Sequence, residues 1–171
     1  MYTRIVVPLD GSDIAEMALL EAEPLAALMH APIHLIRVID VANREMSSVY
    51  ALGSPTAISA LLGDEAEASE QYVESVARAL DQRGVRVTTE VCCGSVAQEL
   101  VAASKPGDLY VMASHGRSGI ARWFMGSVAE DVLRHSSVPI LLVKVSSYTG
   151  GHSGNERRTE HSASDVRTAL R

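Results

Sequence analysis

The sequence predicts a doubly wound α/β domain built on a five-stranded parallel sheet. Short apolar runs alternate with segments of helical periodicity, and a glycine-rich segment directly follows the fourth run. Parallel strands need helical crossovers of one hand, and these crossovers cover both faces of the sheet. The runs expected to form strands are Ile5–Leu9, Pro32–Val38, Val85–Val91, Leu109–Ala113 and Pro139–Val145.

A first helix is expected over Ile14–Met29, where apolar residues recur along one stripe. Pro24 lies in the middle of this segment. An interior proline costs about 3 kcal/mol, because it lacks the N–H group that the helix needs. We therefore expect either a kink or a helix that restarts with Pro24 as its first residue.

A second helix is expected over Glu65–Gln82, with Asp64 and Glu67 as an N-terminal capping pair and Gly84 as its stop. The segment before it, Asn43–Gly63, is rich in Ser, Gly and Ala and forms either a mobile flap or a short additional helix. The apolar face predicted for the second helix consists of Tyr72, Val73, Val76, Ala77 and Leu80.

Two shorter helices complete the alternation. Ser95 with Gln98 opens the third, which ends before Pro106-Gly107. Ser127 with Glu130 opens the fourth. The expected strand order is 3-2-1-4-5, and in such sheets ligands bind beyond the carboxyl ends of the strands, where the winding reverses.

Composition limits the classes of protein that the chain could belong to. Its 171 residues, 47% of them apolar, suit one domain, expected over residues 1–145. Residues 146–171 lack apolar periodicity and are expected to be a disordered tail. No apolar run reaches the roughly 18–20 residues of a membrane span, and the N-terminus shows no signal sequence. A cytoplasmic protein without membrane attachment is expected.

The charge distribution argues against nucleic-acid binding. The chain carries a net charge of −6, and its tail holds four Arg against three acidic residues, so that the first 145 residues carry −7. Electrostatic binding of nucleic acid needs a basic face. Cys92 and Cys93 are adjacent, which is poor geometry for a disulfide and provides no metal site.

The segment Ala113-Ser114-His115-Gly116, followed after nine residues by Gly126-Ser127, is the clearest candidate for a binding site. It connects the fourth strand to a helix N-terminus. Backbone N–H groups and the helix dipole converge on an anion in such a loop. Arg117 adds a charge to the same loop, and the loop therefore favours a phosphate group over an apolar ligand.

Across the predicted switch point, the first strand ends in Pro8-Leu9-Asp10-Gly11-Ser12. An acidic residue that faces a glycine-rich loop suits a nucleoside, with Asp10 near base or ribose donors and the loop near the phosphates. The local alternatives are that Asp10 caps residues 12–13 and that Ser127 only caps its helix.

At this point the sequence resembles the universal stress proteins over roughly residues 2–145. The resemblance rests on Arg4-Ile-Val-Val-Pro-Leu-Asp-Gly-Ser, His34-Leu-Ile-Arg-Val-Ile-Asp, Val111-Met-Ala-Ser-His-Gly-Arg-Ser-Gly, Met125-Gly-Ser-Val-Ala-Glu and Val138-Pro-Ile-Leu-Leu-Val. It implies the adenine nucleotide alpha hydrolase-like fold. ATP-binding members carry G-x-x-G, nine residues, then G-S or G-T, and this chain has Ala113 at the first motif position.

The resemblance implies a binding site for ATP, with or without Mg²⁺. Asp10 and Val38 would flank the nucleoside, and Met112 and Ala113 would lie beside it. The methyl group of Ala113 is tolerable if its φ angle is negative. The remaining expected binding residues are Pro8, Leu9, His115, Gly116, Arg117, Gly126, Ser127 and Val128, of which the last three and Gly116 would meet the phosphates.

Other nucleotide-binding classes fit less well. The chain has no G-x-x-x-x-G-K-[ST] loop and no G-x-G-x-x-G after its first strand, and no nucleophile–base set stands out. We expect an ATP-binding regulatory protein of the stress response rather than an enzyme. The alternatives are a nucleotide-independent dimeric interaction module and a slow ATPase. The segment Ile140–Val145 would be an apolar sheet edge, and its pairing with a second copy predicts a homodimer.

Overall fold

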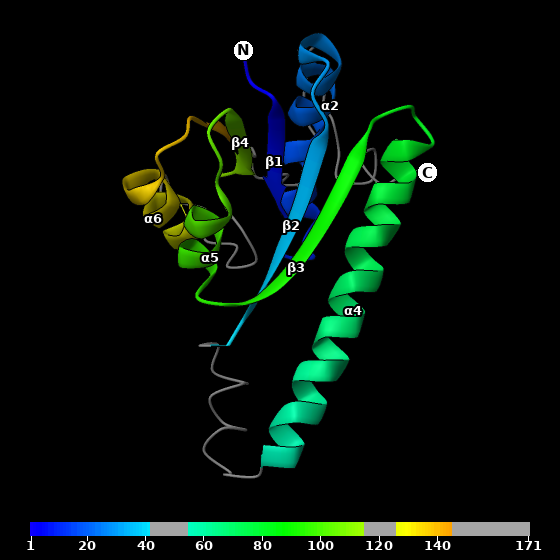
Figure 1. Ribbon diagram of the computed structural model, residues 1–171, viewed down its shortest axis with the longest axis vertical. Helices are drawn as coiled ribbons and strands as arrows, with labels where there is room; N and C mark the ends of the chain where they lie inside the picture. The colour runs from blue at the N-terminus through cyan, green and yellow to red at the C-terminus, as the bar shows by residue number, and fades with distance from the viewer. Residues whose placement is uncertain (42–54, 115–125, 145–171) are drawn as a thin grey trace, which may run out of the picture.

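A computed structural model describes residues 1–41, 55–114 and 126–144 of the chain. Its centre is a five-stranded sheet, parallel throughout, in the order β3-β2-β1-β4-β5 (Figure 1). The predicted fold class and strand order are therefore confirmed. The strands are β1 (Arg4–Pro8), β2 (Ile33–Asp40), β3 (Val87–Gly94), β4 (Asp108–Ala113) and β5 (Ile140–Val143).

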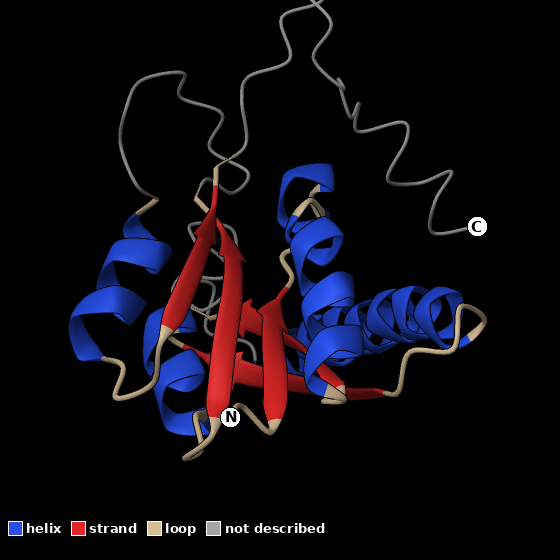
Figure 2. Cartoon of the chain, turned by 90° about the horizontal axis from the view of Figure 1, so that it is seen from above, coloured by secondary structure: helices blue, strands red, loops and turns tan. Residues whose placement is uncertain are grey.

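Helices cover both faces of the sheet (Figure 2). On one face, α1 (Asp13–Glu16), α2 (Ala18–Met29) and α4 (Pro55–Asp81) pack on Ile5, Val7, Leu35 and Val111. On the other face, α5 (Val96–Ala103) and α6 (Ser127–His135) pack on Val6, Ile36, Tyr110 and Met112. Successive strand residues point to opposite faces, and the central strands are apolar at nearly every position because both faces are covered.

The first predicted helix is divided, but not at Pro24. It breaks at Met17, which separates α1 from α2, and Pro24 lies inside α2. Ser12 is the N-cap of α1, and its hydroxyl accepts a hydrogen bond from Ala15 N at 3.1 Å. Buried Ala22 and Ala26 hold α2 to the sheet on either side of Pro24, so tertiary packing retains the helix despite the missing N–H group.

The second predicted helix begins earlier than expected. α4 starts at Pro55, a residue type suited to the first helical position, so Asp64 and Glu67 are exposed interior positions rather than a capping pair. Residues 55–63 of the predicted flap segment therefore belong to this helix, and residues 42–54 lie outside the described residues. The predicted apolar face is confirmed, and the chain turns at Gly84, whose φ is +81°.

Strand ends also differ from the apolar runs. β2 and β3 pair over eight residues, from Ile33 with Val87 to Asp40 with Gly94. The ladder thus includes Thr88, Thr89 and Glu90, which are polar because β3 is an edge strand with exposed side chains. β3 begins two residues later than the predicted strand, which started at Val85, and ends three residues later, because backbone hydrogen bonds, which do not depend on side-chain polarity, continue the ladder through Cys92, Cys93 and Gly94. In contrast, β5 spans only Ile140–Val143 and is shorter than its predicted run, Pro139–Val145.

An ion pair between β1 and β4 anchors the amino-terminal half of the sheet. Arg4 Nε donates to Asp108 Oδ1 at 2.8 Å, and Nη2 donates to Oδ2 at 2.6 Å and to Ala103 O at 3.1 Å. Burial alone would raise the pKa of Asp108, but the hydrogen bonds from Arg4 and from Lys105 N lower it overall. The Asp108 side chain is only 2% exposed.

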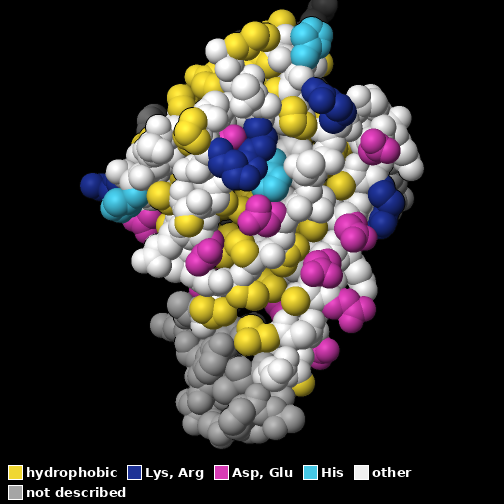
Figure 3. All heavy atoms as spheres, in the orientation of Figure 1, with side chains coloured by type: hydrophobic (Ala, Val, Ile, Leu, Met, Phe, Trp, Pro, Cys, Tyr) yellow, Lys and Arg dark blue, Asp and Glu magenta, His cyan; other side chains and the backbone are white. Residues whose placement is uncertain are grey.

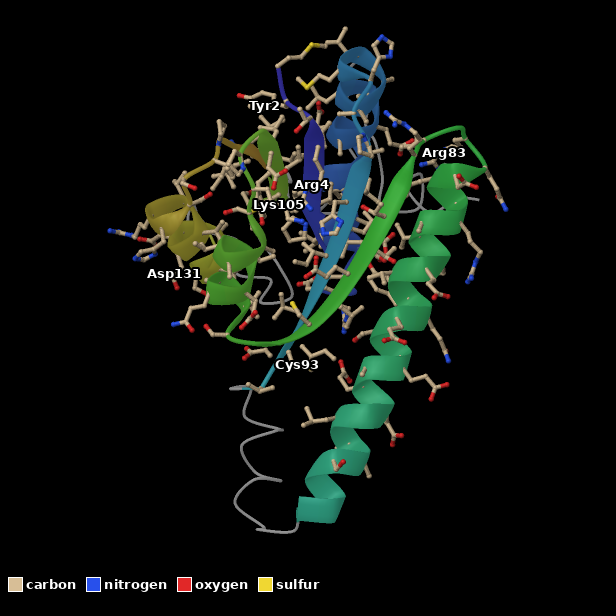
Figure 4. The ribbon with its side chains drawn as sticks, viewed as in Figure 1. Tyr2, Arg4, Arg83, Cys93, Lys105 and Asp131 are labelled. Atoms are coloured by element: carbon tan, nitrogen blue, oxygen red, sulfur yellow. The ribbon has the colours of Figure 1, made fainter. Side chains whose placement is uncertain are left out.

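His34 extends this polar cluster toward the β3 edge. Its Nδ1 lies 2.8 Å from Thr88 Oγ1, and its Nε2 lies 3.1 Å from Glu90 Oε2. Burial, and next the charge of Arg4, lower the pKa of His34 and favour its neutral form. Figure 3 shows basic, histidine and acidic side chains gathered on this face, and Arg4 is labelled in the same region in Figure 4.

We predict that Arg4→Met lowers the free energy of unfolding by about 3 kcal/mol, because it leaves the buried Asp108 carboxylate without its cation. Since the pKa of Asp108 is lowered on folding, the ion pair stabilises the protein above the unfolded pKa of about 3.9. This stabilisation is lost as the pH falls through the folded value. Denaturant melts from pH 7 to pH 3 should show the variant approaching the wild type at the acidic end.

The control is Arg134→Met, which breaks an exposed pair with Glu130 and should leave the free energy of unfolding nearly unchanged, because solvent screens such pairs. Equal losses in the two variants, or a difference between Arg4→Met and wild type that grows below pH 4, would contradict the assignment.

Candidate functional site at the carboxyl edge of the sheet

The winding of the sheet reverses between β1 and β4. β1 pairs with β2 on one side and with β4 on the other. The chain leaves β1 into α1 and α2 on one face, whereas the helix after β4, α6, packs on the opposite face. The loops that follow these two strands therefore diverge, at the place beyond the carboxyl ends where open α/β sheets bind their ligands. The predicted switch point is thus present.

The turn after β1 is organised by Asp10 and Ser12. Asp10 Oδ1 accepts hydrogen bonds from Ser12 N at 2.9 Å and from Ser12 Oγ at 2.5 Å, while Ser12 Oγ caps α1. Asp10 therefore caps the backbone at residue 12, which was the local alternative considered for it from the sequence. Its half-buried carboxylate lies at the switch point. Gly11, between them, has a φ of +82°, a conformation that side-chain-bearing residues rarely adopt.

The two residues before Asp10 lie differently. Leu9 is 3% exposed, packs in the core between the sheet and α1, α2 and α4, and donates its N–H to Ile36 O at 2.9 Å. Pro8, the last residue of β1, is half-buried. The side chain of Leu9 is therefore part of the core rather than of the ligand-facing surface.

Val38 and Met112 lie on the same face of the sheet, the one that α5 and α6 cover. Val38 pairs with Cys92 and is half-buried, and Met112 is 5% exposed. Ala113 ends β4. Among the described residues, His30 is the one non-glycine residue with a positive φ, so Ala113 has an ordinary strand conformation. Its methyl group imposes no backbone strain.

The loop after β4 is closed by backbone hydrogen bonds at its two ends. Ser114 N donates to Val143 O at 2.9 Å, and Gly126 N donates to Ser114 O at 2.8 Å. These bonds bring Ser114 and Gly126 together directly above β4. The predicted binding residues His115, Gly116 and Arg117 lie outside the described residues.

The N-terminus of α6 differs from the prediction. Gly126, with φ −59° and ψ 146°, is the N-cap, and Ser127 is the first helical residue. Glu130 forms no capping box with Ser127, because its carboxylate accepts a hydrogen bond from Arg134 Nη2 at 2.6 Å instead. Gly126 has no side chain to cap the first turn, so nothing from the N-cap competes with an anion for the first-turn N–H groups.

Sequence reasoning missed the part played by Ser12. A serine directly before Asp-Ile-Ala-Glu is a typical N-cap signal, and it could have identified the start of α1. Among the described residues, no group of His, Cys, Asp and Glu could hold a metal ion. In the same ranges, no helix is long and apolar enough to cross a membrane.

The chain is similar to known proteins over this whole domain. A family model described as the Universal stress protein family matches residues 1–144. Universal stress protein MJ0531 of Methanocaldococcus jannaschii is 36% identical over 146 residues, which span 84% of this chain and 83% of the relative.

Two solved structures share the fold. That of hypothetical protein MJ0577, which comes from the same organism, has a TM-score of 0.72 at 30% identity and covers 85% of this chain and 98% of its own. A universal stress protein solved in complex with cAMP has a TM-score of 0.50 at 25% identity and covers 84% of this chain and 97% of its own.

Proposed function

Because the chain belongs to the universal stress protein family, we propose that it is a regulatory protein of the stress response that binds ATP at the carboxyl edge of its sheet. It would act in the cytoplasm. The proposal rests on one observation: the Asp10 turn follows β1 and the N-terminus of α6 follows β4, so that the two lie on either side of the switch point. An acidic group suits a hydroxyl or amino donor of a nucleoside, and a helix N-terminus suits a phosphate.

The solved complex with cAMP supports an adenine nucleotide as the class of ligand. On the nucleoside side, the proposed contacts are Pro8, Leu9 (through its backbone), Asp10, Val38, Met112 and Ala113. On the phosphate side, they are His115, Gly116, Arg117, Gly126, Ser127 and Val128. Mg²⁺ would accompany the phosphates.

Two other functions are distinguishable by simple measurements. In a nucleotide-independent interaction module the loop after β4 would only complete the fold, and purified protein would retain no nucleotide. A slow ATPase would release phosphate over time. The regulatory proposal expects nucleotide in the denatured extract, identified by mass, and phosphate release no faster than in a protein-free control.

We predict that Gly126→Val weakens ATP binding by at least about 100-fold, equivalent to about 2.7 kcal/mol. Valine can adopt the observed φ of −59°, so the fold should persist, but its side chain would occupy the space where phosphate meets the backbone. Ser127→Ala should cost at most about tenfold, because it removes a single hydroxyl donor. Calorimetry with millimolar Mg²⁺ measures both affinities, and circular dichroism monitors the fold.

The matched control is Gly63→Val, because a Cβ atom at Gly63, within α4, would meet nothing within 4 Å. This control should bind ATP as the wild type does. If Gly126→Val also retained full affinity, the phosphate site would not be at α6. If neither the wild type nor Ala113→Gly gave any heat with ATP, the interaction-module alternative would replace the present proposal.

A second prediction separates the two roles of Asp10. Asp10→Asn keeps an oxygen that can accept from Ser12 N, whereas Asp10→Ala removes it. If the carboxylate binds the base or ribose, both variants should weaken adenosine and ATP alike, by about tenfold or more, as for a hydrogen bond to a charged group. Asp10→Asn should keep the wild-type melting temperature. If the Asp10→Asn protein bound adenosine and ATP as tightly as the wild type, the role of Asp10 would be limited to stabilising the turn.

We also propose a homodimer formed through Ile140–Val145. β5 pairs with β4 alone in the described sheet, and Leu141 is 38% exposed. Val143 O accepts from Ser114 N, so Val143 faces β4, and in a parallel ladder its neighbour Leu142 directs its N–H to the open edge.

Leu142→Pro should therefore weaken the dimer, because it removes an outward donor while leaving the pairing with β4 intact. Light scattering across micromolar concentrations measures the mass. A wild-type protein of monomeric mass at these concentrations would contradict the proposed assembly.

A further inference from the structure

Arg37 is a charged residue flanked by Ile36 and Val38 within β2. Its side chain is only 13% exposed. It points to the face that α1, α2 and α4 cover, because Leu35, two residues earlier, packs there. A guanidinium group at such a position needs partners, since burying an unpaired charge is costly.

Three residues of α4 surround the guanidinium group. Arg37 Nε donates to Ser69 Oγ at 2.7 Å, and Nη2 donates to Glu65 Oε1 at 3.2 Å. The Arg37 Cζ atom lies 5.5 Å from the centre of the Tyr72 ring, within the range of a cation–π contact. Ser69 is itself buried, at 1% exposure. α4 therefore holds the guanidinium in one orientation.

The third nitrogen of the group, Nη1, lies against the turn after β1. A Cβ atom built at Gly11 would be 2.9 Å from Nη1, so the guanidinium occupies the space beside the Gly11 backbone. Nη1 is buried and has no hydrogen-bond partner within the described part of the chain. Nη1 of Arg37 therefore packs beside the turn that carries Asp10 instead of donating a hydrogen bond to another described residue.

The same cluster also reaches α1. Tyr72, whose ring Arg37 contacts, donates its hydroxyl to Glu16 Oε1 at 2.9 Å, and Glu16 is 7% exposed. Burial, together with Glu16, strongly raises the pKa of Tyr72, so the hydroxyl stays protonated and remains a donor. Contacts therefore connect α4 to β2 through Arg37 and to α1 through Tyr72, and Arg37 lies against Gly11 in the turn between β1 and α1.

We propose that Arg37 is a positioning residue. Because α4 holds its guanidinium group, Arg37 fixes the Asp10 turn relative to α4 and thereby sets the affinity of the nucleotide site. The affinity part of this inference rests on the function proposed above. Lysine cannot replace it, because a single ammonium group cannot span Ser69, Glu65 and the Gly11 backbone at once, as the planar guanidinium does. Because coupling between sites is reciprocal, a nucleotide at the turn would also stabilise the segment of α4 around Ser69.

The test compares Arg37→Met, Arg37→Lys and Ser69→Ala in the full chain by amide hydrogen exchange without ligand. The reporter is the Ser12 amide, which bonds to Asp10 Oδ1. We expect its exchange to rise at least about tenfold in Arg37→Met, as local opening becomes easier. Arg37→Lys and Ser69→Ala should give smaller increases in the same direction. Amides of β4 should be unchanged.

The matched control is Arg83→Met. Arg83 also links the α4 region to another helix through two hydrogen bonds, to Glu23 of α2, but it lies at the far end of α4 (Figure 4). This variant should leave the Ser12 amide unaffected. If Arg37→Met lowered the melting temperature without selectively raising exchange at Ser12, Arg37 would be an ordinary packing residue and the inference would be overturned.

Titration with MgATP completes the test. Arg37→Met should bind at least about tenfold more weakly, or about 1.4 kcal/mol, with partial recovery in Arg37→Lys, and ATP should slow exchange around Ser69 in the wild type. Unchanged affinity in a variant with a loosened turn would overturn the link to the site. If the wild type bound no nucleotide, the proposed function would fail, and the exchange data alone would decide whether Arg37 positions the turn.

Discussion

The backbone pairing of β1 with β2 on one side and β4 on the other is the constraint on which the rest of the architecture depends. A central parallel strand buries both of its faces, so the crossovers on its two sides must cover opposite faces of the sheet. This requirement sends α1 and α2 to one face and α6 to the other. The loops after β1 and β4 are thereby separated at one edge of the sheet.

Polar residues stabilise this arrangement at both ends of the sheet. Near the amino ends, Arg4 and Asp108 tie β1 to β4, and Arg4 also bonds to the end of α5 through Ala103 O. Near the carboxyl ends, Arg37 ties β2 to α4 through Ser69. The first cluster satisfies the charges that it buries. The second leaves Arg37 Nη1 without a hydrogen-bond partner among the described residues, and such a buried unsatisfied group calls for an explanation beyond stability.

Much of the fold could be predicted from the sequence, because alternating apolar runs and helical stripes are strong local signals. Helix ends were predicted less well. Ser127 and Glu130 match a capping box, but Gly126 N bonds to Ser114 O and so moves the helix start by one residue. That bond joins residues that are distant in sequence, and no local pattern encodes it. Arg37 was missed for the same reason, since its partners lie about thirty residues later, on a helix.

If the chain binds ATP as proposed, its net charge of −6 means that it binds a polyanion against its own long-range field. The attraction therefore has to come from short-range groups at the switch point. Gly126, as N-cap, offers no side chain of its own to compete for the first-turn N–H groups of α6, and the effect of these groups is confined to about one helical turn. Asp10, by contrast, would repel a phosphate placed near it. Under the proposed function, the ligand would lie with its uncharged end at β1 and its anionic end at α6, which is the orientation that a nucleotide, but not inorganic phosphate, can use on both sides at once.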